Sequence, residues 1–321
     1  MGRWARGAHG LIGAGLLAGA IAGSVCGVEW VRVWFYQIAW WGYILLLDGL
    51  IRARTGNSLI IDRRDTFWVM CLASASFWFF WEIVNVRLGN WYYVGVPRSI
   101  WLRWPGAFVA YATVLPGVLE TYEVIRVYGW INCARRVRPF PPGNSWYPWF
   151  FVIGILMFIL PLLYPRLFFP LVWGWMIFAL EPVNHRWGLP SLMREWQQGS
   201  LNTFVRLLVA GGICGLVWES LNWLAAARWV YTIPYLATPK LFAMPLAGYL
   251  GFPPFGVECY EFFACVGLLR GGRGWQAHDH QRTHLPLPPK WVRWVVVAGA
   301  LAMDVVALVL MDRYTIKGWI W

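Results

Sequence analysis

The 321-residue sequence is short of charged residues, since Asp, Glu, Lys and Arg together make up only 13% of it. Soluble globular domains carry about 25% charged residues, so this shortfall argues against a soluble domain. Hydrophobic residues account for 59% and aromatic residues for 18%, and the apolar residues form long runs. Because a helix of about 20 residues crosses a bilayer, these runs predict membrane-spanning helices.

Several motifs of soluble enzymes and metal proteins are missing. The sequence contains no P-loop, no GxGxxG after a strand, no HExxH and no GxSxG. The six cysteines include no CxxC pair, so neither a zinc site nor a disulfide framework is indicated. The five histidines lie outside the expected spans, which disfavours haem or chlorophyll ligation, and HDHQRTH (278–284) favours a solvated loop over a metal site. We therefore expect no metal and no cofactor.

Nine apolar runs are candidate spans, and the fold class we expect is an all-α integral membrane protein. The runs cover about 10–28, 33–51, 66–86, 104–128, 147–164, 168–183, 203–225, 241–270 and 291–311. Most of the 26 tryptophans are expected at the two bilayer interfaces, where this side chain is enriched.

The basic residues orient the expected spans. With the N-terminus in the cytoplasm, 18 of the 27 Lys and Arg residues fall on the cytoplasmic side and nine fall outside. Because basic residues prefer cytoplasmic loops, we expect the C-terminus outside, in a multi-pass protein of a bacterial-type cytoplasmic membrane. The net charge of +12 is then mostly a topology signal, so we expect membrane lipid and no nucleic acid as a partner.

The first apolar run has glycine at every fourth position from Gly15 to Gly27. A basic start followed by an apolar run also fits a signal peptide. The regular glycines favour a retained helix with a flat face, which suits close packing against another helix or a membrane-protein partner.

The two halves of the sequence share three motifs in the same order. FWEIVNVRLGNWYYVGVP (80–97) aligns with VWESLNWLAAARWVYTIP (217–234). The two flanking matches pair 41–59 with 173–192, and 115–125 with 252–263. This order predicts two parallel repeats of four spans, related by an axis along the membrane normal. The expected division is a first repeat in 1–145, a second in 146–270, a cytoplasmic linker in 271–290 and an added C-terminal span in 291–321.

Acidic residues inside a membrane are costly, so they are candidates for function. Eight acids belong to the repeated motifs: Asp48, Glu82, Glu120, Glu123, Glu181, Glu219, Glu258 and Glu261. The motif WExxN occurs at 81–85 and at 218–222, and in each copy the acid and the amide lie on one helix face. Pro116 and Pro254 interrupt corresponding spans, and each can open a helix, where a missing N–H costs nothing. Interrupted spans in both halves indicate a binding site.

A structural role is the alternative for each acid. The Glu–Asn pairs can bond across helices or to freed carbonyl groups, and arginines are available as counter-ions, namely Arg87, Arg126 and Arg228. Asp48 and Glu181 lie at cytoplasmic span ends, where we expect structural ion pairs with neighbouring arginines (Arg52, Arg54 and Arg186). Asp304, within the last span, has no assigned role.

The segments VWESLN, RWVYTIP and GYLGFPPFGVECYEFF follow one another in an order that resembles the lycopene cyclase domain of bacteria, archaea and fungi. The resemblance covers about 38–130 and 170–270. That domain is a three-span module that works as a pair, with adjacent downstream acids where this sequence has E-x-x-E. The resemblance implies a membrane-embedded cyclase or isomerase that acts on a carotenoid-like isoprenoid, in a reaction that consumes no redox equivalent.

Cyclising a polyene end group needs a proton donor, a base and a dry pocket whose aromatic faces stabilise a carbocation. Donor and base candidates are Glu120, Glu123, Glu258 and Glu261, and Glu82 and Glu219 are expected to polarise them. Candidates for binding an isoprenoid-type ligand are Asn85, Asn222, Trp91, Tyr93, Trp229 and Tyr231. Two other functions stay open: a non-catalytic subunit of a larger membrane assembly, such as a pigment–protein complex, and a proton-coupled transporter.

Overall fold

The computed structural model describes residues 7–131, 137–139, 145–235, 237–276 and 285–320, and the described chain is mostly helical with little sheet, as expected. The longer helices are α2 (His9–Val25), α4 (Phe35–Thr55), α6 (Arg64–Leu88), α7 (Ile100–Tyr111), α8 (Val114–Tyr128), α9 (Trp146–Leu163), α11 (Trp175–Arg186), α13 (Asn202–Leu224), α14 (Phe252–Val266) and α15 (Lys290–Leu310).

Short elements connect these helices. Four are α-helical turns, α3 (Glu29–Val33), α5 (Leu59–Asp62), α10 (Pro165–Phe168) and α12 (Leu192–Gln197). Three are 3₁₀ segments, η1 (Phe169–Trp173), η2 (Leu246–Gly251) and η3 (Gly267–Arg270), and η5 (Met311–Thr315) is a π-helical turn. The strands are β1 (Trp91–Val94), β2 (Val96–Pro97), β3 (Arg228–Tyr231), β4 (Lys240–Leu241), β5 (Met244–Pro245) and β6 (Trp319–Ile320).

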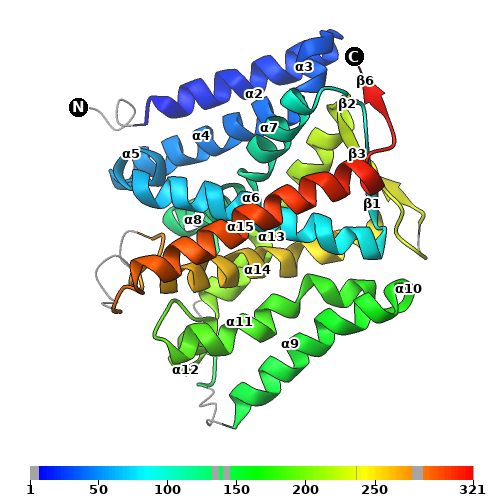
Figure 1. Cartoon of the computed structure of the whole chain (residues 1–321). Coiled ribbons are helices and arrows are strands. Elements are labelled where there is room, and N and C mark those ends of the chain that lie inside the picture. The colour runs from blue at the N-terminus through cyan, green and yellow to red at the C-terminus, as the bar shows by residue number, and fades with distance from the viewer. Residues whose placement is uncertain (1–6, 132–136, 140–144, 236, 277–284, 321) are drawn as a thin grey trace.

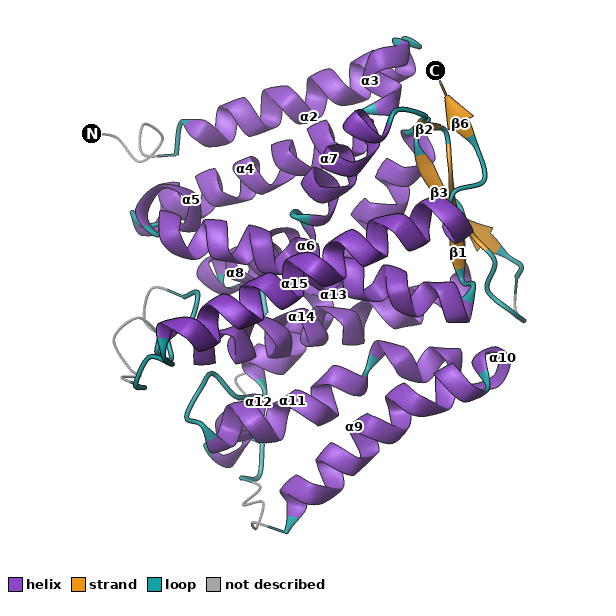
Figure 2. Cartoon of the chain, in the orientation of Figure 1, coloured by secondary structure: helices purple, strands orange, loops and turns teal. Residues whose placement is uncertain are grey.

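The helices form a bundle with two different ends (Figure 1). The labelled strands gather at one end, which we call the sheet end, and α5 and α12 lie at the other, which we call the loop end (Figure 2). The described strands form three two-stranded sheets, β1–β3, β2–β6 and β4–β5. The core between α4, α6, α8, α13 and α14 is rich in aromatic side chains, with Trp40, Trp81 and Phe79 fully buried.

Seven helical segments are long and apolar enough to cross a membrane. They are Arg64–Leu88, Ile100–Tyr128, Trp146–Leu163, Pro165–Arg186, Asn202–Leu224, Leu246–Arg270 and Lys290–Thr315. Two of the nine expected spans do not reach this standard within the described residues. Helix α2 is apolar but has only 17 residues, and α4, with 21 residues, is less apolar.

Prolines interrupt two corresponding segments, as expected. One segment breaks between α7 and α8, and the other changes from η2 to α14. Pro116 and Pro254 are each the third residue of the helix that follows, rather than the first as expected. A proline is tolerated at this position because the first N–H groups of a helix have no partner within the helix. The first helical hydrogen bond of α8 comes after Pro116, from Gly117 N to Thr113 O at 2.8 Å.

The register of the β1–β3 sheet relates the two WExxN motifs. The strands are antiparallel, and Tyr92 lies opposite Val230, the residue that aligns with it in the second half. Trp91 therefore lies opposite Tyr231, and Tyr93 opposite Trp229. A two-fold axis between the motifs requires this register, although the full division into two repeats stays a prediction.

Helix α2 packs on α4 through glycines other than the expected ones. A Cβ atom added to Gly13 would lie 2.4 Å from Leu46 N, so the two backbones are in direct contact there. Gly15 and Gly19, from the expected flat face, have no neighbouring atom within 4 Å. The face of α2 that packs on α4 is therefore not the expected glycine face. A partner that binds at Gly15 and Gly19 stays a prediction.

The start of the expected linker 271–290 belongs to the folded structure at the loop end. Trp275 is buried, and its ring packs on Tyr122 with the centroids 5.6 Å apart. Arg63 donates to the Trp275 carbonyl, and Gln276 Nε2 donates to Glu123 Oε2 at 3.2 Å. The HDHQRTH segment lies outside the described residues.

Candidate functional site

Two asparagines build the site by folding the chain back after α6 and after α13. Asn85 Nδ2 donates to the Trp91 carbonyl at 2.9 Å, and its Oδ1 accepts from Trp91 N at 3.3 Å. Asn222 makes the same pair of bonds with the Trp229 backbone, both at 3.0 Å. Asn85 and Asn222 thus fix the following strands and bring the side chains of those strands back over the glutamates.

Glu82 is fully buried near the end of α6, and one of its carboxyl oxygens receives a dense set of hydrogen bonds. Oε1 accepts from Tyr93 Oη at 2.5 Å and from Trp78 Nε1 at 2.9 Å. It also accepts from Trp91 Nε1 at 3.2 Å and Tyr111 Oη at 3.3 Å. The other oxygen, Oε2, is buried without a hydrogen-bond partner among the described residues.

Glu219 has the corresponding place at the end of α13, with a simpler set of contacts. Its Oε1 accepts from Tyr231 Oη at 2.6 Å, and Trp229 Nε1 donates to the same tyrosine oxygen at 2.7 Å. Glu219 Oε2 is also buried without a partner in the described chain. The tyrosine–glutamate pair is therefore present twice, once from each motif.

Both pairs adjoin one cavity of about 470 Å³ at the sheet end. Its wall includes Tyr93 and Tyr231, with the two glutamates directly behind them. Most of the remaining wall is aromatic or aliphatic, and Trp78 and Trp218 contribute rings whose centroids lie 5.0 Å apart. A ligand in this cavity would meet tyrosine and tryptophan side chains, whose aromatic faces stabilise positive charge.

The rim of this cavity is apolar as well. Leu167 of α10 is 67% exposed, Leu250 of η2 is 77% exposed and Tyr235 is 68% exposed, and all three line the cavity. Exposed leucines at the edge of an aromatic cavity favour an apolar ligand over a water-soluble one.

The two tyrosines stay protonated in this setting. Burial raises the pKa of the Tyr93 hydroxyl well above its usual value, and the Glu82 charge adds to the increase. Burial and the Glu219 charge do the same for Tyr231. Both hydroxyl groups are therefore donors at neutral pH.

The other four acidic candidates lie away from this cavity. Glu258 Oε1 accepts from Met176 N at 3.1 Å, and Glu261 Oε2 accepts from Asn184 Nδ2 at 2.7 Å. Glu123 pairs with Arg126, while Glu120 is buried with its Oε2 unpartnered among the described residues. The structure therefore brings Glu82 and Glu219 to the cavity and keeps the proposed donors and bases in the helix packing.

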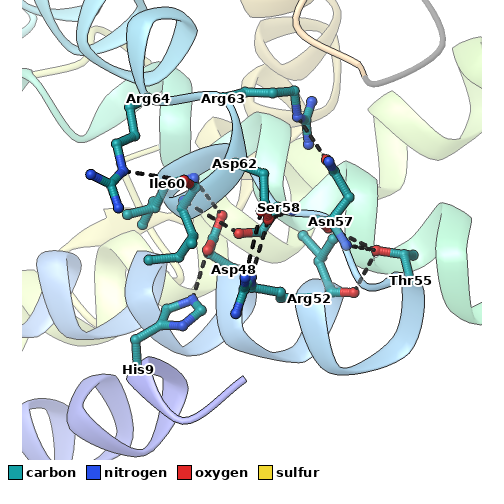
Figure 3. Close-up of polar contacts among 12 residues, drawn as sticks. His9, Asp48, Arg52, Thr55, Asn57, Ser58, Ile60, Asp62, Arg63 and Arg64 are labelled. Atoms are coloured by element: carbon teal, nitrogen blue, oxygen red, sulfur yellow. Dashed lines mark hydrogen bonds and ion pairs between the residues drawn. The ribbon is translucent and has the colours of Figure 1, made fainter. Parts of the chain in front are cut away.

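Asp48 and Glu181 have the structural role expected of them, but not through arginines. Asp48 accepts from Ile60 N at 2.9 Å and from His9 Nε2 at 2.7 Å, whereas Arg52 pairs with Asp62 (Figure 3). Glu181 caps the first turn of α12 in the same way, because its oxygens accept from Leu192 N at 3.0 Å and Met193 N at 2.8 Å. The expected ion pairs with Arg52, Arg54 and Arg186 are wrong, since free backbone N–H groups at helix starts take both carboxylates.

Trp78 and Tyr111 both bind Glu82, but neither was predicted from the sequence. Tyr111 comes five residues before Pro116, and Tyr249 comes five residues before Pro254. The alignment of the halves therefore contained a signal for this tyrosine. Trp78 had no such signal, because the second half has Gly215 at the equivalent place.

Comparisons with known proteins found no family model, no curated protein and no solved structure that matches this chain. The described part of the chain also has no group of three or more His, Cys, Asp or Glu side chains placed to hold a metal ion. The candidate site therefore stands on its own geometry.

Proposed function

We propose that the protein is a membrane-embedded enzyme that carries out acid–base isomerisation or cyclisation of an apolar isoprenoid-type lipid. The observation that carries this proposal is the pair of tyrosine–glutamate dyads, supplied by equivalent motifs, beside one aromatic cavity. A largely apolar pocket with a few convergent polar groups is the usual form of a small-molecule site.

A membrane setting is supported by the outer surface as well as by segment length. Helix α15 exposes large apolar side chains along its length, among them Trp294, Val305 and Val309. Helix α9 exposes Trp149 and Leu156 in the same way. Such surfaces are stable in contact with lipid tails, which also makes the membrane the source of the substrate.

The proposed reaction uses the dyads as donor and acceptor. One dyad adds a proton to a carbon–carbon double bond of the polyene and leaves a carbocation on the adjacent carbon. Attack by a neighbouring double bond closes the ring and moves the positive charge, which the indole faces stabilise. The other dyad removes a proton and restores a double bond, so the substrate gains one proton and loses one, and nothing is oxidised or reduced.

The contacts of the two dyads assign their roles. Four hydrogen bonds donated to Glu82 Oε1 favour a carboxylate, so Tyr93 and Glu82 are the proposed base. Glu219 Oε1 accepts from Tyr231, and Trp229 Nε1 donates to the Tyr231 oxygen rather than to the carboxyl group. Because fewer donors stabilise a charge on Glu219 than on Glu82, Tyr231 and Glu219 are the proposed proton donor. The tyrosines meet the substrate, and the glutamates behind them hold the proton.

Deuterium incorporation tests the proposal. Membranes containing the protein are given an acyclic carotenoid such as lycopene in D₂O, and the products are separated and weighed by mass spectrometry. The expected product is an isomer with one deuterium for each ring formed. Y231F should remove both product and label, whereas Y249F is the matched control, because the Tyr249 hydroxyl bonds the Leu241 carbonyl outside the cavity. Unlabelled product, or unchanged labelling in folded Y231F, contradicts the proposal.

A role as a subunit of a larger membrane assembly is the second candidate, and one observation favours it. Gly15 and Gly19 have open space above them, although glycines in spans commonly mark close helix packing. Isolation in mild detergent tests this role, because a stoichiometric partner lost on substitution of both glycines with leucine supports it. Recovery of the chain alone contradicts it.

A further inference from the structure

A second, smaller cavity of about 90 Å³ adjoins the first at the sheet end. It lies between the start of α4, helix α7, strands β1 and β3, and η5. Trp78, Tyr93 and Trp229 line both cavities, so these side chains form a partition between them.

The second cavity is lined by several side chains that carry polar groups. Tyr36, Tyr93 and Tyr111, each with a hydroxyl group, line it together with Gln37. Gln37 Nε2 donates to the Gly106 carbonyl at 3.3 Å, but its Oε1 is buried without a partner among the described residues. Water is stable in a cavity of this size when two to four polar groups can bind it, and these groups meet that condition.

Two charged side chains, Arg103 and Arg228, also line this cavity. Arg103 is fixed by Asp312, with nitrogen–oxygen distances of 2.7 and 2.6 Å. Arg228, at the start of β3, is exposed, so the cavity reaches the surface of the sheet end. Water inside it can therefore exchange with bulk solvent.

A chain of hydroxyl groups joins this cavity to Glu82. Tyr111 Oη lies 3.0 Å from Tyr93 Oη, which lies 2.5 Å from Glu82 Oε1. Tyr111 Oη is also 3.3 Å from Glu82 Oε1, so the hydrogen-bonded path has no gap. Both tyrosines line the second cavity, and Tyr93 lines the first as well.

We propose that the second cavity is a water-filled chamber and that Tyr111 and Tyr93 relay protons between this water and Glu82. This inference rests on the proposed function and deepens it. Each turnover leaves a proton on the base, and the large cavity is apolar and occupied by lipid. The base must therefore exchange its proton on the other side of the Trp78–Tyr93 partition.

In the release step, one proton passes from Glu82 to water along the two tyrosine hydroxyl groups. The protonated Glu82 carboxyl gives its proton to Tyr93 Oη, Tyr93 gives its own proton to Tyr111 Oη, and Tyr111 gives its own to a water molecule. Each hydroxyl gains one proton and loses one, Glu82 becomes a carboxylate, and the hydronium ion leaves to bulk solvent. Release returns Glu82 to the carboxylate that the base needs for the next turnover, so Tyr111 is a positioning and relay residue that does not touch the substrate.

The second half of the molecule supplies a natural control. Tyr249 aligns with Tyr111, but its hydroxyl group donates to the Leu241 carbonyl at 3.0 Å. It is therefore turned towards the β4–β5 hairpin (Lys240–Pro245) instead of joining a path to the carboxyl.

Infrared hydrogen–deuterium exchange tests the relay without any substrate. The difference between wild-type and E82Q spectra identifies the protonated carboxyl band of Glu82, and a rapid change to D₂O gives its exchange rate in the full-length protein. We expect Y111F to slow this exchange about tenfold or more, since one relay step is removed. A107L, which fills the second cavity, should slow it too, and Y249F should leave it unchanged.

The relay is overturned if folded Y111F and A107L exchange as fast as wild type, or if Y249F slows exchange as much as Y111F. It is also overturned if no E82Q-sensitive carboxyl band occurs at any pH at which the protein is folded. These results are independent of turnover, so they are distinguishable from a failure to convert the polyene, which would remove the proposed function instead.

Discussion

The Glu82 site and the Glu219 site start from the same motif and differ in what surrounds it. Both glutamates accept from a tyrosine of the following strand, and both lie behind one cavity wall. Glu82 also binds Trp78 and Tyr111, whereas the equivalent positions hold Gly215 and the outward-turned Tyr249. The shared parts lie beside one cavity, and the differences are the basis on which we propose that one half acts as donor and the other as base.

The largest expected effect on stability comes from placing at Gly215 the tryptophan that the first half has at the equivalent position. Gly215→Trp should prevent folding, because a Cβ at Gly215 would already lie 2.2 Å from the Phe252 ring. Overpacking of this kind costs about 3 kcal/mol or more. Gly212→Ala is the matched control, since its nearest neighbour, Pro253 Cγ, lies 4.0 Å away. Thermal unfolding followed by tryptophan fluorescence measures both, and a stable Gly215→Trp protein would show that the asymmetry is not fixed by packing.

The asparagine clamps should matter equally in the two halves. Asn85→Ala removes three hydrogen bonds to the backbone that follows α6, and Asn222→Ala removes two to the backbone that follows α13, so each leaves backbone polar groups unpaired. Each is expected to lower the free energy of unfolding by about 2 kcal/mol. Chemical unfolding in detergent checks this, and a large effect in one half with none in the other would break the structural equivalence of the motifs.

Trp78→Phe should affect the Glu82 site alone. The change keeps an aromatic ring between the cavities but removes the indole N–H that bonds Glu82 Oε1. We expect turnover of the polyene to fall about tenfold, with little change in affinity, because one charge-assisted hydrogen bond to the base is lost. Separate measurement of kcat and KM checks this expectation. An increase in KM with kcat unchanged would instead assign Trp78 to ligand binding.

The smallest expected effect concerns Asp62 at the loop end. Burial by itself would raise the pKa of Asp62, but hydrogen bonds from Arg52 and Ser58 N hold it below its usual value. Because the folded state has the lower pKa, this contribution to stability is present at neutral pH and is lost as the pH falls through the acidic range. Asp62→Asn should therefore lose less stability on acidification than wild type. The difference in the free energy of unfolding should be less than about 1 kcal/mol, as for a partly exposed ion pair, and thermal unfolding at several pH values measures it. An identical pH profile in the variant would remove this role.

Duplication was the most informative property of the sequence. The WExxN alignment placed Glu82 with Glu219 and Tyr93 with Tyr231, and the structure puts all four beside one cavity. The helical class followed from apolar run length, because hydrogen-bonding rules leave few alternatives for such runs.

Side-chain direction could not be obtained in the same way. Glu258 and Glu261 share a helix face, but that face turns to α11, where Met176 N and Asn184 bind them. Asp48 has two arginines nearby in sequence, Arg52 and Arg54, yet a backbone N–H of α5 and His9 bind its oxygens. The winning partners come from other helices, and their positions depend on how the helices pack rather than on local spacing.

The central claim is that two tyrosine–glutamate dyads act on one apolar ligand. Y93F and Y231F test it most directly when carotenoid binding, followed by quenching of the cavity tryptophans, is measured beside product formation. We expect each variant still to bind the polyene and to form product at least about 100-fold more slowly, since each removes one proton-transfer group. Full turnover in either folded variant would contradict it.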